Sequence, residues 1–342
     1  MKKKIISLLV IMSLCVCILG DGASAKEKQF QRQDTNYKYN EDRDFDKTAM
    51  YLANDGKVHY VWHDTAYDKK NDEYHTVFHR NAIDGKKIKK MCTFKDKAFD
   101  LYWNVRVLDD KTLTIRQNDK DKLFIKEFDK NGKNIFTYQE KKNIQFDWIC
   151  GWDDGKNIYY TYKDTKLNGN SYVINTRCIN KKSKKAKNVG SLKLLGMMSE
   201  APLRMMSYSI EVENGQIYVL SDKEINVYSF KGKLLNTCNL PDGEKLIRIS
   251  DDPELVNYLS IDKFTVFGKF VYYCNRNGIY RWNMKGRDGF KLYYNAEGDE
   301  YFKTEYGLSD ICVKDENTIY MMFHSMINYE LGISKIVRYR RK

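Results

Sequence analysis

The sequence lacks the short motifs by which several large enzyme classes are recognised. Its 342 residues contain no Gly-x-Ser-x-Gly elbow, no His-Glu-x-x-His pair and no glycine-rich phosphate loop followed by Lys-Ser/Thr. Each of these motifs places a nucleophile, a metal or a phosphate cradle at a fixed spacing. Their absence excludes those classes of serine hydrolase, zinc peptidase and nucleotide hydrolase, and it leaves any chemistry to residues that are distant in sequence.

Proline and helical periodicity are also scarce. There are only three prolines, and apolar residues seldom recur at the spacing of an amphipathic helix. Alternating segments are common instead, as at 216–220 and 318–323, where β-branched and aromatic residues are frequent. Such segments are typical of β-strands. The sequence therefore predicts an all-β fold.

An apolar leader precedes the predicted fold. Lys2–Lys4 form a charged start, Ile5–Leu19 is apolar, and small residues ending at Ala25 match a cleavage site. This pattern is typical of a secretory signal peptide. We therefore expect residues 1–25 to be removed, and the mature protein to be secreted or displayed at the cell surface.

Two cysteines in this leader, Cys15 and Cys17, leave lipid attachment open as an alternative. Leu14 and Val16, which precede them, are larger than the residues that normally precede a lipid-modified cysteine, so cleavage at Ala25 is favoured. No later segment is a run of about 18 apolar residues, and the sequence therefore predicts no membrane span.

Positively charged residues outnumber negatively charged ones in the sequence. Lys and Arg number 59 against 46 Asp and Glu, which gives a formal net charge of +13. Such a surface favours anionic partners, namely wall polymers, acidic glycans, lipid headgroups or nucleic acid, although a lysine-rich exported protein is often simply soluble and basic. Basic and acidic residues are mostly interspersed, so we expect no nucleic-acid partner. The one dense basic run, 181–187, falls where a hairpin turn is expected.

Cysteines outside the leader each lie inside a predicted strand. They are Cys92, Cys150, Cys178, Cys238, Cys274 and Cys312. An even number in an exported chain permits disulfides. There is no Cys-x-x-Cys pair, however, and the neighbouring residues are apolar. We therefore expect buried free thiols that act as small hydrophobic side chains.

One short pattern recurs along the chain: a turn rich in Asp, Asn and Gly, then an alternating strand that contains tyrosine. The turns lie near Gly56, Asp110, Gly155, Gly215, Gly268 and Glu316. A spacing of roughly 45 to 60 residues is typical of a fold that repeats one small unit. The acid pair Asp153-Asp154 is expected to form part of one such turn, and the tyrosines are expected to fill the space between units.

Each unit continues through a third strand to a second turn and a fourth strand. The second turns are Asp84-Gly85-Lys86, Asn131-Gly132-Lys133, Lys231-Gly232-Lys233 and Lys285-Gly286-Arg287. In the third unit the basic run 181–187 takes the place of this turn. Six units of four antiparallel strands are typical of a six-bladed β-propeller.

The last unit lacks a fourth strand, because its strands at 311–314, 318–323 and 334–339 bring the sequence to its last residues. The segment 26–48 is available to supply that strand, with Gln29–Gln31 as the candidate. Such a strand would close the ring and remove an exposed sheet edge. The predicted divisions are a signal peptide at 1–25, an N-terminal segment at 26–48 and a propeller at 49–342.

Two segments, Asn157–Tyr162 and Ile279–Trp282, are similar to a Tyr-Trp-Thr-Asp motif. On these segments and the repeat, the chain resembles six-bladed propellers of the TolB and low-density-lipoprotein-receptor type. The resemblance covers nearly all of the chain after the leader and implies the fold. Propellers serve as hydrolases, lyases, sensors and scaffolds, so the resemblance implies no single activity.

Four of the five histidines fall in one predicted hairpin of the first unit. They are His59, His63, His75 and His79. If the hairpin turns at Lys69, His59 opposes His79 and His63 opposes His75, with Cβ atoms about 4.5–5.5 Å apart. Neutral imidazoles at this distance suit Zn, Cu or Ni, and Glu73 lies at the right parity to join them. These residues are the candidate divalent-metal site.

Two other interpretations of the histidines stay open. They can be ordinary hydrogen-bonded side chains between blades, or a cluster that responds to pH. A register shift of one residue would place the two sets on opposite faces of the sheet. Because no further ligand completes a tetrahedral set, we expect no cofactor, with a divalent metal as the exception to be tested.

We expect the chain to be a monomeric binding module without catalytic activity, with a protein or a cell-wall glycan as its ligand at the mouth of the ring. The first alternative is an extracytoplasmic carbohydrate-active hydrolase or lyase with its site at the same mouth. The second is a structural partner in a larger envelope complex. Clustered acids with shifted pKa values favour the enzyme, an aromatic or basic rim favours the binding module, and a large apolar patch favours the structural partner.

Overall fold

The computed structural model describes residues 30–35, 44–97, 101–108, 110–118, 120–164, 171–195, 209–221, 223–243, 246–248, 258–260, 262–303, 306–327 and 330–341. Within these ranges the backbone is almost entirely β-strand, with one short helix, α2, at Glu300–Lys303. The expected leader at 1–25 lies outside the described residues. No helix in the described ranges is long and apolar enough to cross a membrane.

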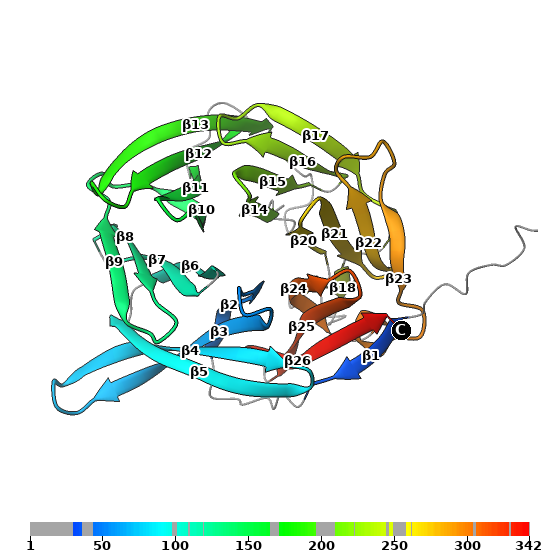
Figure 1. Cartoon of the computed structure of the whole chain (residues 1–342), viewed down its shortest axis with the longest axis horizontal. Helices are drawn as coiled ribbons and strands as arrows, with labels where there is room; N and C mark the ends of the chain where they lie inside the picture. Colours follow the sequence, from blue (N-terminus) through cyan, green and yellow to red (C-terminus); the bar gives the residue numbers. More distant parts are fainter. Residues whose placement is uncertain are drawn as a thin grey trace, which may run out of the picture.

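Six sheets of four antiparallel strands form a ring, as Figure 1 shows, and this confirms the predicted all-β, six-bladed propeller. The first blade contains β2 (Asp44–Leu52), β3 (Val58–Asp68), β4 (Glu73–Asp84) and β5 (Lys87–Lys97). The second contains β6 (Leu101–Leu108), β7 (Lys111–Gln117), β8 (Leu123–Phe128) and β9 (Asn134–Gln139). The third contains β10 (Phe146–Asp153), β11 (Asn157–Asp164), β12 (Ser171–Asn180) and β13 (Lys185–Leu195).

The remaining three blades repeat this order. The fourth contains β14 (Ser209–Glu213), β15 (Gln216–Leu220), β16 (Glu224–Ser229) and β17 (Leu234–Asn239). The fifth contains β20 (Lys263–Phe267), β21 (Phe270–Asn275), β22 (Gly278–Asn283) and β23 (Lys291–Asn295). The sixth contains β24 (Gly307–Asp315), β25 (Thr318–Ile327), β26 (Glu330–Arg341) and β1 (Phe30–Asp34). A separate pair, β18 (Leu246–Arg248) and β19 (Tyr258–Ser260), lies between the fourth and fifth blades in the sequence.

The predicted turns all join neighbouring strands of one blade. At Asn214-Gly215, for example, both residues have positive φ, 50° and 75°, as a two-residue hairpin turn requires. Because the strands are antiparallel, the turns after the first strand of every blade and after the third strand of the first five blades lie on one face of the ring. We call this face the turn face; the functional sites below are placed relative to it.

The core lies in the seams between blades. Six separate clusters of buried side chains each draw on two neighbouring blades. The second strands of five blades place tyrosines there at 2% exposure or less: Tyr60, Tyr160, Tyr218, Tyr272, Tyr273 and Tyr320. Large rings suit this position because each must span the gap to the next sheet. The expectation that the tyrosines fill the space between units is confirmed.

The N-terminal strand closes the ring. β1 pairs antiparallel with β26, from Phe30 opposite Arg341 to Asp34 opposite Val337. The Thr35 hydroxyl donates to the Ile336 carbonyl oxygen at 2.8 Å. The predicted closing strand is thus confirmed, although it begins one residue later and ends three residues later than Gln29–Gln31. The sixth blade gains its fourth strand from the other end of the chain, which leaves β26 with a partner on both edges.

The cysteines outside the leader carry free thiols, as predicted. Five of them are buried, and Cys92 in β5 is half-buried. Burial raises the pKa of Cys150, Cys274 and Cys312. A raised pKa keeps a thiol protonated and unreactive, so these side chains act as packing residues.

Candidate functional site

The histidines of the first blade do not pair as predicted. The register of β3 and β4 places His59 opposite Ala82 and His79 opposite Trp62, three residues away from the expected pairing. The hairpin turns later because its tip contains no glycine and uses Asp72 at a positive φ of 53° instead. Side chains alternate between faces, so this odd shift puts the histidines of β3 and those of β4 on opposite faces of the sheet.

His59 is a buried structural side chain. Its Nδ1 accepts a hydrogen bond from Arg80 Nε at 3.0 Å, and its Nε2 lies 3.0 Å from Asp55 Oδ2. With Nδ1 as acceptor, the ring is neutral and donates through Nε2. Burial lowers the pKa of His59, which agrees with this neutral form.

The other three histidines have separate surroundings. His79 stacks on Trp62 with ring centroids 3.9 Å apart, His63 packs against the Phe78 ring at 5.5 Å, and His75 Nε2 lies 3.6 Å from Asp68 Oδ2. Among the described residues, no group of three or more His, Cys, Asp or Glu side chains is arranged to hold a metal ion. Metal binding by these histidines stays a prediction, without the pairing that motivated it.

A different group of polar side chains gathers on the inner strands, which Figure 1 shows around the centre of the ring. We call it the central cluster; its members are Tyr51 on β2, Arg106 on β6, Glu211 and Glu213 on β14, Lys263 on β20, Asp310 on β24 and His324 on β25. Five of the six blades contribute. Each side chain except Arg106 is half-buried, because it is surrounded by protein yet still meets solvent.

Arg106 links four blades at this centre. Its guanidinium donates to the Gly151 carbonyl oxygen at 3.1 Å and to the Val212 carbonyl oxygen, and it forms an ion pair with Glu213. It also lies over the Tyr51 ring, 4.8 Å from the centroid. The side chain is 3% exposed. Although burial alone would lower it, the field of Tyr51 and Glu213 raises the pKa of Arg106, so the guanidinium stays charged.

Glu211 and Asp310 are the acids of the cluster whose pKa values are raised. Burial raises the pKa of Glu211 to about 8, and the nearby charge of Asp310 adds to this shift. Burial also raises the pKa of Asp310 to about 6, although its carboxylate accepts hydrogen bonds from the Met50 and Ile311 amides at 2.5 and 2.8 Å. Near neutral pH, Glu211 therefore carries a proton while Asp310 is mostly ionised.

His324 and Lys263 complete the cluster beyond these acids. His324 Nδ1 lies 2.9 Å from the Ser309 hydroxyl oxygen. Burial and the charge of Lys263 lower the pKa of His324 to about 4, so the ring is neutral at neutral pH. The cluster as a whole presents a protonated acid, a carboxylate and a lysine on strands of three blades.

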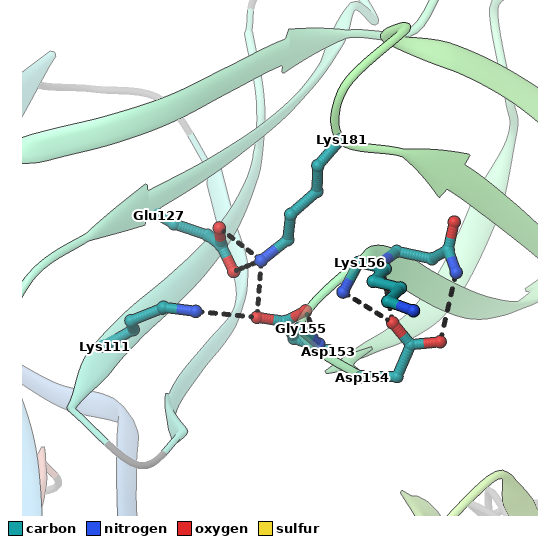
Figure 2. Close-up of polar contacts among 8 residues, drawn as sticks. Lys111, Glu127, Asp153, Asp154, Gly155, Lys156 and Lys181 are labelled. Carbon is teal, nitrogen blue, oxygen red and sulfur yellow. Dashed lines mark hydrogen bonds and ion pairs between the residues drawn. The ribbon is translucent and has the colours of Figure 1, made fainter.

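A second acid group, which we call the seam cluster, lies at the turn face between the second and third blades (Figure 2). Lys181 Nζ lies 2.9 Å from Glu127 and 2.6 Å from Asp153, and Lys111 Nζ lies 3.4 Å from Asp153. Both acid side chains are almost inaccessible, at 2% and 4% exposure. Two buried acids and two half-buried lysines from neighbouring blades thus meet at this seam.

The pKa values of the two acids of the seam cluster are shifted in opposite directions. Burial and a hydrogen bond to Asp153 raise the pKa of Glu127 to about 7. Hydrogen bonds from Glu127, Lys181 and the Gly155 amide outweigh burial and lower the pKa of Asp153. The carboxyl of Glu127 thus keeps its proton to a higher pH than that of Asp153. The network joins two blades across their seam, and we assign it to stability.

Replacing Glu127 by Gln is expected to remove part of the pH dependence of folding. A raised folded-state pKa contributes stability that is complete below the unfolded value near 4.5 and is lost as pH rises through about 7. A shift of this size corresponds to about 3 kcal/mol. Urea unfolding at a series of pH values should therefore show a shallower decline for Glu127→Gln than for the native chain between these limits.

The exposed variant Asp288→Asn is the matched control, because Asp288 lies at the surface, where it pairs with Lys291. Lys291 lowers the pKa of Asp288, so this variant should leave the unfolding profile unchanged between about pH 4.5 and 7. Parallel profiles for the native chain and Glu127→Gln over this range would show that the raised pKa of Glu127 contributes nothing to the pH dependence of stability.

The sequence contained a signal for the central cluster. Arg106 and Glu211 each stand between two apolar residues, four positions before a turn anchor, and an isolated charge inside an alternating strand usually has a buried partner. Asp154 behaves as predicted, because it accepts hydrogen bonds from the Lys156 and Asn157 amides. Asp153 does more than the predicted turn formation, since it also binds the two lysines of the seam cluster.

Comparison with protein-family models finds no match, and comparison with curated proteins finds none either. Several solved structures have similar backbones at low identity. An α-L-arabinofuranosidase, Arb93A from Fusarium graminearum, shares 11% identity at a TM-score of 0.47, with 91% of this chain and 96% of that one covered. The Neurospora crassa Pan2 WD40 domain shares 7% identity at a TM-score of 0.46, with 93% and 97% covered.

The β-propeller domain of a Pyrococcus furiosus protease is a third similar structure, with 12% identity, a TM-score of 0.38, and 84% of this chain and 83% of that one covered. The strand order described above identifies the six-bladed propeller, whereas these scores are too low to support an argument about activity. The similar structures also do not distinguish propellers of the TolB and low-density-lipoprotein-receptor type from other propellers.

Proposed function

We propose that the chain is an exported glycan-binding propeller that recognises a polyhydroxylated ligand at the centre of its ring. The observation that carries this proposal is the convergence of Glu211 and Asp310, two acids from different blades with unequal pKa values. A protonated carboxyl donates a hydrogen bond and an ionised one accepts, and a sugar hydroxyl can satisfy both. Lys263 supplies a further donor beside them.

The export part of this proposal rests on the apolar leader described from the sequence. The glycan part rests on the chemistry of the cluster. Its acids remain half-buried, so solvent reaches them, and a ligand that displaces this water must replace its hydrogen bonds. Tyr51 contributes an aromatic ring to the cluster, although the Arg106 guanidinium already covers one face of this ring. A ligand rich in hydroxyl groups meets these requirements better than an apolar one.

A carbohydrate-active hydrolase is the second candidate, because clustered acids with shifted pKa values were the feature expected of an enzyme. Glycosidases use one protonated carboxyl as general acid and one carboxylate as base or nucleophile. The raised pKa of Glu211, near 8, and the lower one of Asp310, near 6, suit these two roles. The same two residues therefore serve either function, and the variants below separate them.

The variant Glu211→Gln is expected to retain glycan binding within about threefold, because its amide still donates a hydrogen bond. If the site were hydrolytic, the same change would remove the general acid and lower turnover by about 10²–10⁴-fold. Calorimetric titration with cell-wall oligosaccharides measures the binding, and chromatography of the same mixtures detects cleavage products.

Asp310→Asn is expected to weaken binding by about tenfold, because its carboxylate is the charged acceptor and charge-assisted hydrogen bonds are the stronger ones. Asp288→Asn, which changes an exposed acid away from the centre, is the matched control. Unchanged affinity in Asp310→Asn, or no binding of any oligosaccharide by the native chain, would contradict a site at the ring centre.

The hypothesis that the chain is a structural partner in a larger envelope complex has less support. Large exposed apolar side chains occur on outer strands of four blades, at Met91, Ile135, Leu234, Leu235 and Leu292. Leu234 and Leu235 are neighbours on β17, and the other three lie singly on different blades; small groups of this kind are normally tolerated on soluble surfaces. We therefore place the principal site at the centre and not on the outer wall.

A further inference from the structure

A groove of about 460 Å³ opens at the seam between the fourth and fifth blades. It lies on the turn face, since the turns Asn214-Gly215 and Gly268-Lys269, and the third-to-fourth strand turn at Lys285, all border it. Gln216, Tyr218 and Leu235 also line the groove. None of these residues belongs to the central cluster, so the groove is a separate site.

The shape of the groove is fixed by contacts between its walls. Asn236 of β17 donates through Nδ2 to the Met284 carbonyl oxygen across the seam at 2.8 Å. The same side chain accepts from the Thr237 amide at 2.9 Å, so both ends of its amide are used. Tyr218 lies below as a buried floor at 1% exposure. The hydrogen bond between Asn236 and Met284 thus ties the two walls of the groove together.

Two exposed lysines give the groove a positive charge. Lys269 and Lys285 both border it, and neither ammonium forms an ion pair with a carboxylate among the described residues; Lys269 lies only over the Phe270 ring, 5.2 Å from its centroid. Glu213 is the carboxylate with the strongest influence on Tyr218, but the Arg106 guanidinium neutralises it. Among the described lining residues, an anionic group in the groove would therefore meet two cations and no carboxylate.

Polar side chains in the lining of the groove can donate hydrogen bonds to the hydroxyl groups of a ligand. Gln216 Oε1 accepts from the Tyr218 hydroxyl at 2.8 Å, which orients its amide nitrogen as a donor. Asn214, in the turn, places a second exposed amide at the edge. Leu235, 46% exposed, forms an apolar wall beside them. A mixed lining of this kind fits a sugar ring, which has both hydroxyl groups and an apolar face.

We propose that this groove binds a carboxylate-bearing sugar, a uronate residue of an anionic glycan. The two lysines bind the carboxylate, the amides of Gln216 and Asn214 bind ring hydroxyls, and Leu235 covers the apolar face of the ring. The site differs from the ring-centre proposal in its place and in the charge of its ligand. An acidic glycan that reaches both sites would be held at two points on one propeller.

The test uses tri-galacturonate as the probe, with galactotriose as its uncharged counterpart, on the chain that begins at Lys26. Calorimetric titration at low salt is expected to show binding of tri-galacturonate and at least tenfold weaker binding of galactotriose. The double variant Lys269→Gln/Lys285→Gln should weaken tri-galacturonate binding by about tenfold, because each exposed ion contact contributes modestly. Binding should also weaken as salt rises.

The matched control is Lys182→Gln/Lys185→Gln, which removes the same charge from an exposed turn of the third blade. Equal weakening in both double variants would overturn the proposal, because the attraction would then come from net charge alone. Absence of tri-galacturonate binding, or equal affinity for tri-glutamate, would overturn it as well. Glu211→Gln and Asp310→Asn should leave tri-galacturonate affinity at the groove unchanged, so this site and the ring centre succeed or fail separately.

Discussion

Replacing Arg106 by methionine is expected to lower the free energy of unfolding by about 3–5 kcal/mol, which is the range for breaking a buried ion pair from one side. The guanidinium contacts the backbone of β10 and β14, the Tyr51 ring and Glu213. Methionine preserves much of the volume but none of these hydrogen bonds, and it leaves Glu213 without its partner. Urea unfolding followed by far-ultraviolet circular dichroism measures the loss.

Arg287→Met is the matched control, because Arg287 is exposed in the turn between β22 and β23. It should change stability by less than about 0.5 kcal/mol. The double variant Arg106→Met/Glu213→Gln should recover part of the loss, since the remaining carboxylate is then removed. If Arg106→Met costs less than about 1 kcal/mol, the central arginine does not hold the blades together.

Removal of β1 is expected to produce the second large effect. A chain that begins at residue 36 should be less stable than one that begins at Lys26 by several kcal/mol, at about 1 kcal/mol for each backbone hydrogen bond lost from the β1–β26 ladder. It also loses the ion pair between Arg32 and Asp299, whose charged atoms lie 3.1 Å apart. The freed edge of β26 should pair with other chains. Light scattering after size exclusion would then show oligomers that grow with concentration.

Arg32→Ala in the longer chain separates the ion pair from the strand itself. Arg32 is 35% exposed and stacks over Tyr301 at 5.1 Å, so its loss should cost about 1 kcal/mol and leave the chain monomeric. Truncation that leaves both stability and monomer unchanged would show that the ring does not depend on the strand from its N-terminal segment.

The architecture could be predicted because its determinants are local. A turn such as Asn214-Gly215 needs residues that accept positive φ, and an alternating strand needs one buried and one variable face. Tyr60 and Tyr218 recur at the same place in their blades because the gap between sheets has one width. Even the closing strand followed from counting, since a sixth blade with three strands requires a fourth.

The histidine hairpin shows where local information fails. Its tip, from Asp68 to Glu73, contains no glycine to mark the turn, and the register depends on which residue adopts positive φ. The structure selects Asp72, while Lys70 donates its amide to the Asp68 carboxylate at 3.0 Å. An odd shift exchanges the two faces of β4 relative to β3, so a small error in the turn removed the predicted metal pairs entirely.

Patterns of neighbouring residues predicted the number of blades, the turn positions and the tyrosine-filled seams, and the strand count of the last unit predicted the closing strand. Which polar side chains meet depended on the three-dimensional arrangement of the blades. Arg106 and Glu213 are 107 residues apart, and Lys269 borders the same groove as Asn214 because two blades are neighbours in the ring. A ring brings distant strands to one axis and distant turns to one face, and this closure is what assembles both proposed sites.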